Sequence, residues 1–245
     1  MSDKKIPSRT AGSSDPVTRR SDTTAIDAFV RQARALSTAS RAEGGGRLVL
    51  ALDATMSRQP TWDLAVSLQG EMFDAVAKAG GLNVQLVYFR GFNECRASKF
   101  VSDTGSLKEL MTRIDCRGGH TQIGKVLSHA LKENERGKVN ALVFIGDAME
   151  EAVDDLAEKA GRLGLHGVPV FLFQEGHDPA AETAFREIAR LSKGAWFRFD
   201  RSAASTLSRL LSAVAVYASG GLSALEARGR AEDRLMIEHL TGGGR

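Results

Sequence analysis

The strongest constraint on this chain is a short apolar run at residues 48–52, which is followed at once by Asp53, Thr55 and Ser57. An unbroken run of this length is typical of a central strand in a parallel sheet, where both faces of the strand are buried. Side chains two positions apart on an extended chain point the same way. The sequence therefore predicts three hard oxygens on one side of the chain, at the carboxyl end of a buried strand.

This position favours a binding site, because ligands of open α/β sheets bind outside the carboxyl ends of the strands. Oxygen donors with no Cys or His nearby suit a hard cation such as Mg²⁺, Mn²⁺ or Ca²⁺. The spacing alone is a weak signal, and its place directly after a buried strand strengthens it. The alternative interpretation is that Asp53 and Thr55 only cap the following helix.

The length of 245 residues allows one large α/β domain or two small ones. A hydrophobic content of 42% with 26% charged residues is ordinary for a soluble globular protein. We expect no membrane association, because no stretch approaches the ~18 apolar residues of a membrane span. We expect a cytoplasmic location, because the N-terminus lacks the apolar core of a signal peptide.

The net charge of +3 comes entirely from residues 1–43, which carry eight Lys and Arg against five Asp and Glu. The rest of the chain balances at 25 basic and 25 acidic residues, which is a poor footprint for a nucleic-acid partner. The two cysteines, Cys95 and Cys116, show no metal-ligand spacing and no disulfide framework, so we expect free thiols.

The domain organisation follows from changes in composition along the chain. Residues 1–22 have almost nothing to bury and predict a disordered basic tail. Apolar residues at helical spacing predict a flanking helix within 23–43. We place the main domain at 44–219 and a C-terminal helix and tail at 220–245. The helix expected at 223–240 should bury only its ends and serve recognition or assembly; the alternative is that it packs beside the flanking helix.

Strands and helices alternate along the main domain, which predicts a three-layer, doubly wound, mostly parallel sheet of six strands with helices on both faces. The strands at 48–53 and 139–145 should be central and adjacent, because both are apolar runs that need cover on both sides. A short strand near 99–101 is expected to be antiparallel at an edge. The other expected strands are 83–89, 169–173 and 195–199, and the expected helices are 60–78, 106–114, 122–134, 152–165, 180–192 and 203–218.

Two further oxygen-bearing residues follow elements that this sheet brings to the same rim. Thr121 lies between a Gly-Gly turn and an expected helix, and Asp147 closes the second long apolar strand. Together with Asp53, Thr55 and Ser57 they make a divided site of two carboxylates and three hydroxyls from three loops.

This set of motifs resembles the metal-ion-dependent adhesion site of the von Willebrand factor A (VWA) domain family, over about residues 47–217. The hallmarks of that family are Asp-x-Ser-x-Ser after the first strand, a Gly-Gly-Thr element further on, and an Asp after the following central strand. The matching segments here are Asp53-Ala54-Thr55-Met56-Ser57, Thr121 in GGHTQIGKVL and Asp147 in VFIGDAMEE. Three departures are Thr55 in place of Ser, His120 before Thr121, and Ala148 after Asp147.

The resemblance implies a Rossmann-like domain that holds Mg²⁺, with Mn²⁺ or Ca²⁺ as alternatives. It implies neutral oxygens from Thr55, Ser57 and Thr121, with Asp53 and Asp147 binding partly through water. A dication held mainly by hydroxyls and water keeps much of its charge, so it can take a carboxylate from a partner protein. We therefore expect a non-enzymatic protein-binding module, an adaptor in a cytoplasmic assembly. Some bacterial members of the family work beside AAA+ ATPases, which makes such an ATPase a candidate partner.

The alternative function is a Mg²⁺-dependent phosphoryl-transfer enzyme of the dehalogenase type, or a receiver domain, with Asp53 as nucleophile or phosphoacceptor. Dehalogenases usually carry a second Asp two residues later as acid and base, where this chain has Thr55. A receiver would need an acidic pair near the end of its first strand and a Lys after a late strand. Neither is clear in this sequence, so the residues favour a binding module.

Several charged residues close to these motifs have two interpretations. Glu150, Glu151, Asp154 and Asp155 are candidate additional ligands, and the preferred interpretation is an acidic first turn of the next helix, where the helix dipole favours them. His120 is a candidate ligand or gate, and the preferred interpretation is a solvent-facing loop residue.

Overall fold

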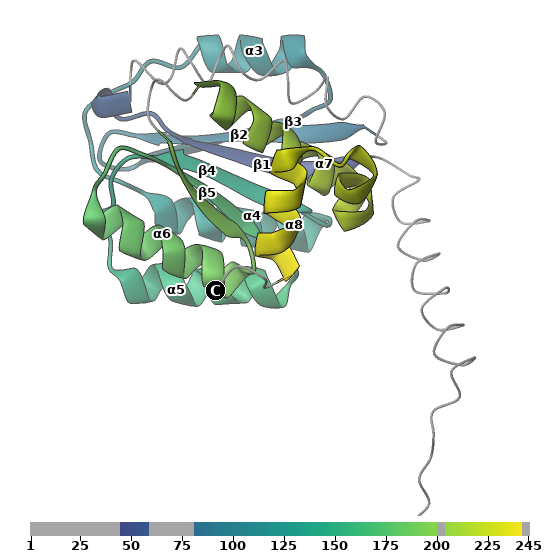
Figure 1. Ribbon diagram of the computed structural model, residues 1–245. Coiled ribbons are helices and arrows are strands. Elements are labelled where there is room, and N and C mark those ends of the chain that lie inside the picture. Colours follow the sequence, from purple (N-terminus) through teal and green to yellow (C-terminus); the bar gives the residue numbers. More distant parts are fainter. Residues whose placement is uncertain (1–44, 59–80, 200–203, 242–245) are drawn as a thin grey trace, which may run out of the picture. The chain divides into compact units, whose positions relative to one another are not determined.

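The computed structural model describes residues 45–58, 81–199 and 204–241 (Figure 1). The predicted tail at 1–22, the flanking helix within 23–43 and the helix at 60–78 lie outside the described residues.

The described strands form a mostly parallel six-stranded sheet in the order β3-β2-β1-β4-β5-β6. Only β3 is antiparallel to its neighbour, β2; the other neighbouring pairs are parallel. The fold prediction is confirmed, with β1 and β4 central and adjacent and an antiparallel strand, longer than expected, at one edge. The bounds are β1 Gly46–Asp53, β2 Leu82–Arg90, β3 Glu94–Val101, β4 Ala141–Gly146, β5 Val170–Glu175 and β6 Ala195–Phe199.

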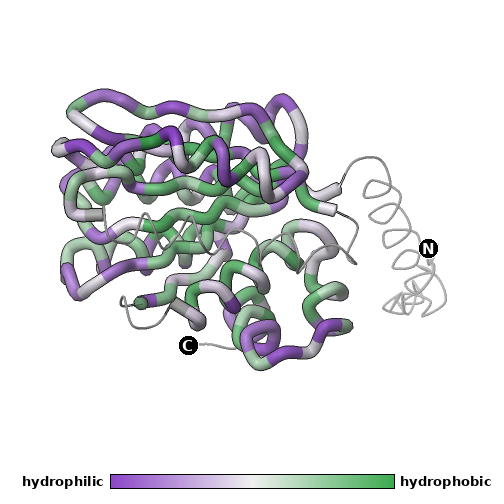
Figure 2. The backbone as a smooth tube through the Cα atoms, turned by 90° about the horizontal axis from the view of Figure 1, so that it is seen from above, coloured by the Kyte–Doolittle hydropathy of each residue, from purple (hydrophilic) through white to green (hydrophobic). Residues whose placement is uncertain are grey.

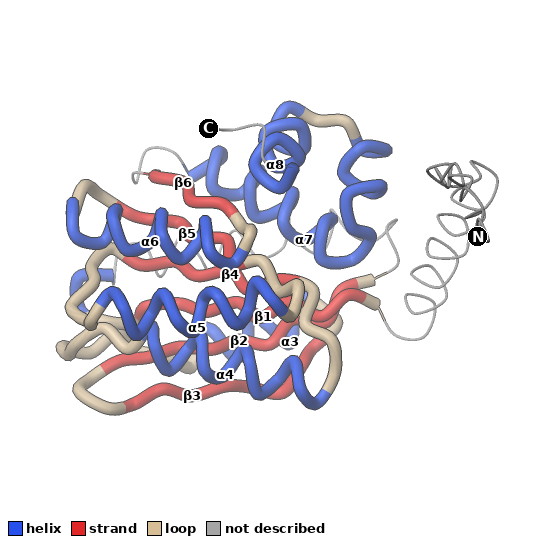
Figure 3. Tube along the Cα trace, turned by 90° about the horizontal axis from the view of Figure 1, so that it is seen from below, coloured by secondary structure: helices blue, strands red, loops and turns tan. Residues whose placement is uncertain are grey.

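Helices cover both faces of the sheet (Figures 1 and 3). On one face lie α3 (Thr104–Thr112) and α7 (Ala204–Arg228), and on the other lie α4 (Ile123–Arg136), α5 (Val153–Leu165) and α6 (Pro179–Ser192). A short 3-10 helix, η1 (Met56–Arg58), follows β1, and α8 (Ala231–Thr241) packs beside α7.

Burial of β1 explains why its apolar run is continuous. Leu48, Leu50 and Leu52 pack into the core on the side of α3 and α7, while Val49 and Ala51 pack into the core on the side of α4, α5 and α6. All five side chains are at most 3% exposed. Figure 2 shows hydrophobic residues along the central strands and hydrophilic residues in many of the loops at their ends.

The C-terminal segment differs from its prediction. In place of one helix at 223–240, α7 continues past a non-helical Gly221, and α8 begins after Gly229, whose φ is 65°. Leu225 and Met236 are fully buried. Both residues lie in the two apolar ends that were expected to be buried, so that expectation holds for them. It is wrong for the charged stretch between them, where Asp233 is 0% exposed, because a left-handed glycine turns α8 back against α7 and the sheet.

A buried ion pair fastens α7 to α8. The Nε atom of Arg228 lies 3.0 and 2.8 Å from the two carboxylate oxygens of Asp233, and its Nη2 atom bonds the same carboxylate. Asp233 is 0% exposed and also accepts a hydrogen bond from the Arg230 backbone N–H, at 2.9 Å. Arg228 donates in addition to the Ser212 carbonyl, at 3.3 Å. These partners allow the carboxylate of Asp233 to be fully buried.

The structure also corrects the expectation about membrane spans. Within the described residues, helix α7 is long and apolar enough over Ser205–Arg228 to cross a membrane by length and composition, with a mean hydropathy of 1.4. Inside the protein, 61% of that apolar window is buried. Core helices of soluble proteins meet the same two criteria.

We predict that Asp233→Ala lowers the free energy of unfolding by about 3–5 kcal/mol, because it leaves the Arg228 guanidinium half-buried without its carboxylate. Urea denaturation of the full chain measures this loss. The matched control is Asp155→Ala, since Asp155 is also the third residue of its helix but is exposed. A loss in the Asp233 variant no larger than in the control would contradict a stabilising role for the pair.

Candidate metal centre

The first part of the site is the loop that leaves β1. Asp53 ends the strand and is 2% exposed. Its Oδ1 atom accepts a hydrogen bond from the Thr55 backbone N–H at 2.8 Å, and Thr55 Oγ1 lies 3.2 Å from Ser57 Oγ. The three predicted oxygens do lie together, but a tight turn into η1 gathers them, not strand alternation. One oxygen of Asp53 therefore serves the local turn. The helix that Asp53 and Thr55 cap in the alternative interpretation, at 60–78, lies outside the described residues.

The second part is the Gly-Gly loop before Thr121. Arg117 forms an isolated parallel bridge with Thr55, which sets this loop beside the first. The His120 N–H donates to the Gly91 carbonyl at 3.2 Å. An added Cβ on Gly119 would lie 2.1 Å from that same carbonyl oxygen. Glycine is needed at this position because two backbones approach each other too closely for any side chain.

The third part is the loop after β4. The register of β4 places Ile145 beside Leu52, so Gly146 follows level with Asp53. An added Cβ on Gly146 would lie 3.7 Å from the Asp53 Cβ atom. Asp147 comes next, and its buried Oδ1 atom has no hydrogen-bond partner among the described residues.

Reciprocal hydrogen bonds tie Thr121 to the loop that carries Asp147. Thr121 Oγ1 accepts from the Glu150 backbone N–H at 3.0 Å, and the Thr121 N–H donates to Glu150 Oε2 at 3.2 Å. The same carboxylate lies 2.9 Å from His120 Nδ1. The His120 side chain is exposed, as predicted, and packs edge-on against Phe92.

Glu151 caps α4 from the same loop. Its carboxylate accepts hydrogen bonds from the backbone N–H groups of Ile123 and Gly124, the latter at 2.9 Å. Helix N-termini leave such groups unsatisfied and favour negative charge. The interpretation of Glu150 and Glu151 as the first turn of the next helix is therefore wrong, because α5 begins only at Val153.

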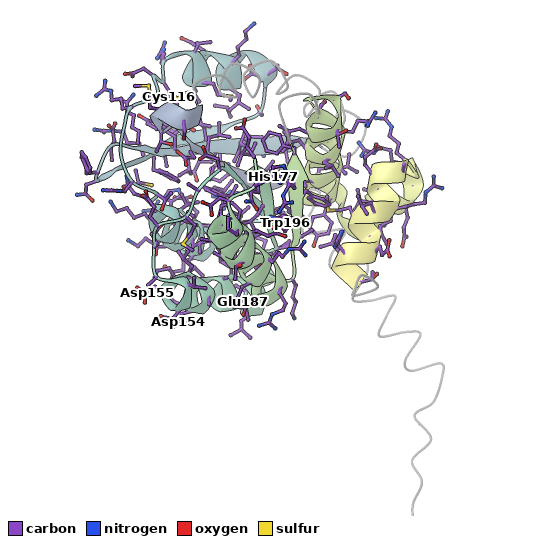
Figure 4. All side chains as sticks on the ribbon, turned by 60° about the vertical axis from the view of Figure 1, so that its left-hand side comes forward. Cys116, Asp154, Asp155, His177, Glu187 and Trp196 are labelled. Carbon is purple, nitrogen blue, oxygen red and sulfur yellow. The ribbon has the colours of Figure 1, made fainter. Side chains whose placement is uncertain are left out.

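Asp154 and Asp155 do occupy the first turn of α5 and are exposed at its outer end (Figure 4). Sequence reasoning missed the bracing role of Glu150 and Glu151 because their partners lie far away in the chain. The available signal was their position before Val153, the first residue of the apolar helical pattern of α5.

The residues that could hold a metal are Asp53, Thr55, Ser57, Thr121 and Asp147. Within the described part of the chain, no three His, Cys, Asp or Glu side chains gather into a cluster able to bind a metal. A cation here would therefore depend on the hydroxyls. The donor set fits a hard dication, and a buried carboxylate oxygen such as Asp147 Oδ1 is costly unless a cation, a proton or a hydrogen bond compensates it.

Neither Cys95 nor Cys116 forms a disulfide, as predicted. Cys95 lies on β3, and burial raises the pKa of its thiol. Cys116 is buried. A raised pKa disfavours the thiolate of Cys95, which is the reactive form of the residue.

Solved structures with the same architecture identify the fold. A von Willebrand factor type A protein from Catenulispora acidiphila is 16% identical, with a TM-score of 0.57 over 71% of this chain and 43% of that chain. The SpRpn10 VWA domain is 14% identical, with a TM-score of 0.55 over 73% of this chain and 98% of that chain. The chain has a VWA fold.

A third structure with this VWA fold is proximal thread matrix protein 1 from the mussel byssus, described with a zinc-occupied MIDAS motif. It is 18% identical, with a TM-score of 0.52 over 71% of this chain and 46% of that chain. No protein-family model and no curated protein sequence matches the chain. Because one fold hosts many functions, the function of this domain has to be argued from its own site.

We predict that Glu151→Ala destabilises the domain by about 0.5–2 kcal/mol, the usual cost of losing a helix cap. The amide protons of Ile123 and Gly124 should exchange faster, because they lose their acceptor. Thermal unfolding and hydrogen exchange measure the two effects. Glu151→Gln keeps one acceptor oxygen and should lose less stability.

The matched control for this prediction is Glu158→Ala, which removes an exposed carboxylate 3.9 Å from Arg162 on α5. Unchanged exchange of Ile123 and Gly124 in Glu151→Ala would contradict the capping role.

Proposed function

We propose that the protein is a metal-dependent protein-binding module. Asp53, Thr55, Ser57, Thr121 and Asp147 hold a divalent cation, with Mg²⁺ as the first candidate and Mn²⁺ or Ca²⁺ as alternatives. The observation that carries the proposal is the Oδ1 atom of Asp147, a buried carboxylate oxygen with no hydrogen-bond partner among the described residues. Asp147 directly follows Gly146, the residue of β4 that lies level with Asp53 on β1. The zinc-occupied motif of the mussel protein supports divalent binding in this fold.

The donor set determines what the bound cation can do. Three of the five proposed donors are neutral hydroxyls, so the cation keeps the capacity to attract a further anionic ligand. We propose that this ligand is an acidic side chain of a partner protein. The proposed role of the domain is an adaptor in a cytoplasmic assembly, with an AAA+ ATPase as a candidate partner; this part rests on the resemblance drawn from the motifs.

The proposed role is binding without catalysis. Thr55 stands where a dehalogenase carries its acid–base Asp, and its hydroxyl lies 3.2 Å from that of Ser57. A pair of hydroxyls supplies no general acid or base near neutral pH. Glu150 and Glu151 are engaged in bracing the Thr121 loop and capping α4.

We predict that Asp53→Ala reduces Mg²⁺ and Mn²⁺ affinity at least tenfold, on the order of 1.4 kcal/mol or more of binding free energy. Isothermal titration calorimetry of the full chain measures the affinity, and circular dichroism should remain nearly unchanged. Asp155→Ala, on the exposed first turn of α5, is the matched control. Undiminished affinity in Asp53→Ala would rule out the proposed site.

Thr121 provides a second test of the metal site. Thr121→Val removes the hydroxyl and should weaken Mg²⁺ binding in calorimetry, whereas Thr121→Ser keeps the hydroxyl and should bind as the wild type does.

The partner is tested by capture from lysate with and without EDTA, followed by identification of the proteins that EDTA releases. Capture that is equal in both conditions would contradict a metal-dependent contact.

A further inference from the structure

A second surface lies at the edge of the sheet opposite β3. Strand β6 ends the sheet there, and an open groove of about 1150 Å³ runs along it between α6 and α8. The metal centre lies elsewhere, in the loops after β1 and β4. The residues that line this groove include Arg186, Arg190, Lys193, Arg198, Leu235 and Leu240.

The backbone of β6 is open along this groove. In a parallel pair, alternate residues direct both their N–H and C=O groups toward the neighbouring strand. The Phe199 carbonyl accepts from the Gly176 N–H at 3.3 Å, so Phe199 faces β5. Trp196 and Arg198 then direct their backbone groups outward. No backbone hydrogen bond from outside the sheet reaches either of them among the described residues, which leaves a template for an additional strand.

The wall on the α6 side is basic. Its cations are Arg186, Arg190, Lys193 and Arg198. Two carboxylates compensate them in part: Glu182 pairs with Arg186 at 3.0 Å and also with Arg198, and Glu187 pairs with Arg190 at 2.6 Å. No acidic residue is among the described residues that line the groove. The wall therefore keeps a positive excess.

The wall on the α8 side carries two leucines beside His239 and Thr241. Leu235 is 41% exposed, and Leu240 lies five residues further along the helix. The His239 ring packs edge-on against Phe197 below them. An exposed leucine such as Leu235 gains free energy when an apolar side chain of a ligand covers it, and Leu240 is already partly buried against the core.

Trp196 sits on the basic side and arranges two of the cations. The guanidinium of Arg186 lies 4.0 Å from the ring centroid and that of Arg198 lies 5.2 Å from it, while Trp196 Nε1 donates to Gln174 Oε1 at 3.0 Å. Because two guanidinium groups already contact the Trp196 ring, the ring does not offer a free face on which a nucleobase could stack. Arg186 and Arg198 line the groove, where they favour an anionic ligand other than a nucleic acid.

We propose that the β6 groove binds an extended acidic peptide of a partner protein, which adds to the sheet as a further strand. Side chains of an added strand alternate between the two faces of the sheet. Its acidic residues would meet Arg186, Arg190 and Lys193 on the α6 side, and its apolar residues would meet Leu235 and Leu240 on the α8 side. The recognised sequence therefore alternates acidic and apolar residues. The chain's own residues 1–43 are net basic and are a poor occupant.

This binding needs no metal, so it is tested in EDTA, where its result is independent of the metal centre. The probe is a fluorescein-labelled peptide of alternating Glu and Val or Leu, titrated with the full chain and followed by fluorescence anisotropy. Leu235→Asp should weaken binding about tenfold or more, while Leu222→Asp, at an exposed leucine away from the groove, should not.

A matched pair of arginines tests the basic wall. Arg190 and Arg136 both lie in the last turn of a helix, both are about 70% exposed, and both pair with a Glu three residues earlier. Arg190→Gln should weaken probe binding about threefold, an effect typical of an exposed charge at the rim of an interface, while Arg136→Gln should leave it unchanged.

Strand addition itself is tested through the probe's backbone. Two probes are compared, one N-methylated at the odd positions and the other at the even positions. Methylation should abolish binding in the probe whose methylated N–H groups would face β6, and should leave binding intact in the other probe. Three results would overturn the proposal: no saturable binding, equal effects of the two methylation phases, or displacement of the probe by oligothymidine at lower concentration than by unlabelled peptide. The last would assign the groove to single-stranded nucleic acid.

Discussion

Burial of β1 on both faces is the constraint from which the rest of the structure follows. A strand whose leucines face one helix layer and whose Val49 and Ala51 face the other requires two helix layers and a neighbouring strand on each side. The same constraint determines where polar chemistry can begin. Asp53 is the first charged residue after the run, and it remains buried because the turn to Thr55 supplies a hydrogen-bond donor to its carboxylate.

The loops of the metal centre are held by interactions that are not themselves proposed to bind a cation. The carboxylate and the backbone N–H of Glu150 both form hydrogen bonds with Thr121. The Glu151 carboxylate accepts from backbone N–H groups at the N-terminus of α4. Backbone contacts at Gly119 and Arg117 set the Thr121 loop against its neighbours. Supporting groups of this kind determine how well a site is preorganised, because each donor can be only as well placed as the loop that carries it.

The two surfaces proposed here select for related chemistry by different physical means. The metal rim would attract a single carboxylate through a concentrated charge. The β6 groove would recognise a spaced row of carboxylates through arginines and through backbone hydrogen bonds along an open edge. An acidic partner segment is favoured in both cases, although the net charge of the chain outside residues 1–43 is zero. The distribution of charge over the fold, more than its sum, decides what such a domain can bind.

Local sequence patterns were enough to predict those parts of the structure that depend on how each segment is buried. Apolar runs and their order predicted the sheet, the central pair β1 and β4, the antiparallel edge strand and the bounds of β6, because periodicity reports how each segment is buried. The cluster of Asp53, Thr55 and Ser57 was also predictable, since a few adjacent residues form it.

Features that depend on contacts between distant segments became visible only in the folded protein. It showed that Glu150 and Glu151 brace another loop, and that Gly229 with the pair Arg228 and Asp233 folds α8 into the core. It also placed the basic wall of α6 opposite exposed Leu235. Periodicity states that a face must be covered, but it carries no information about which distant segment covers it, and that choice is made by packing and by the pairing of buried charges.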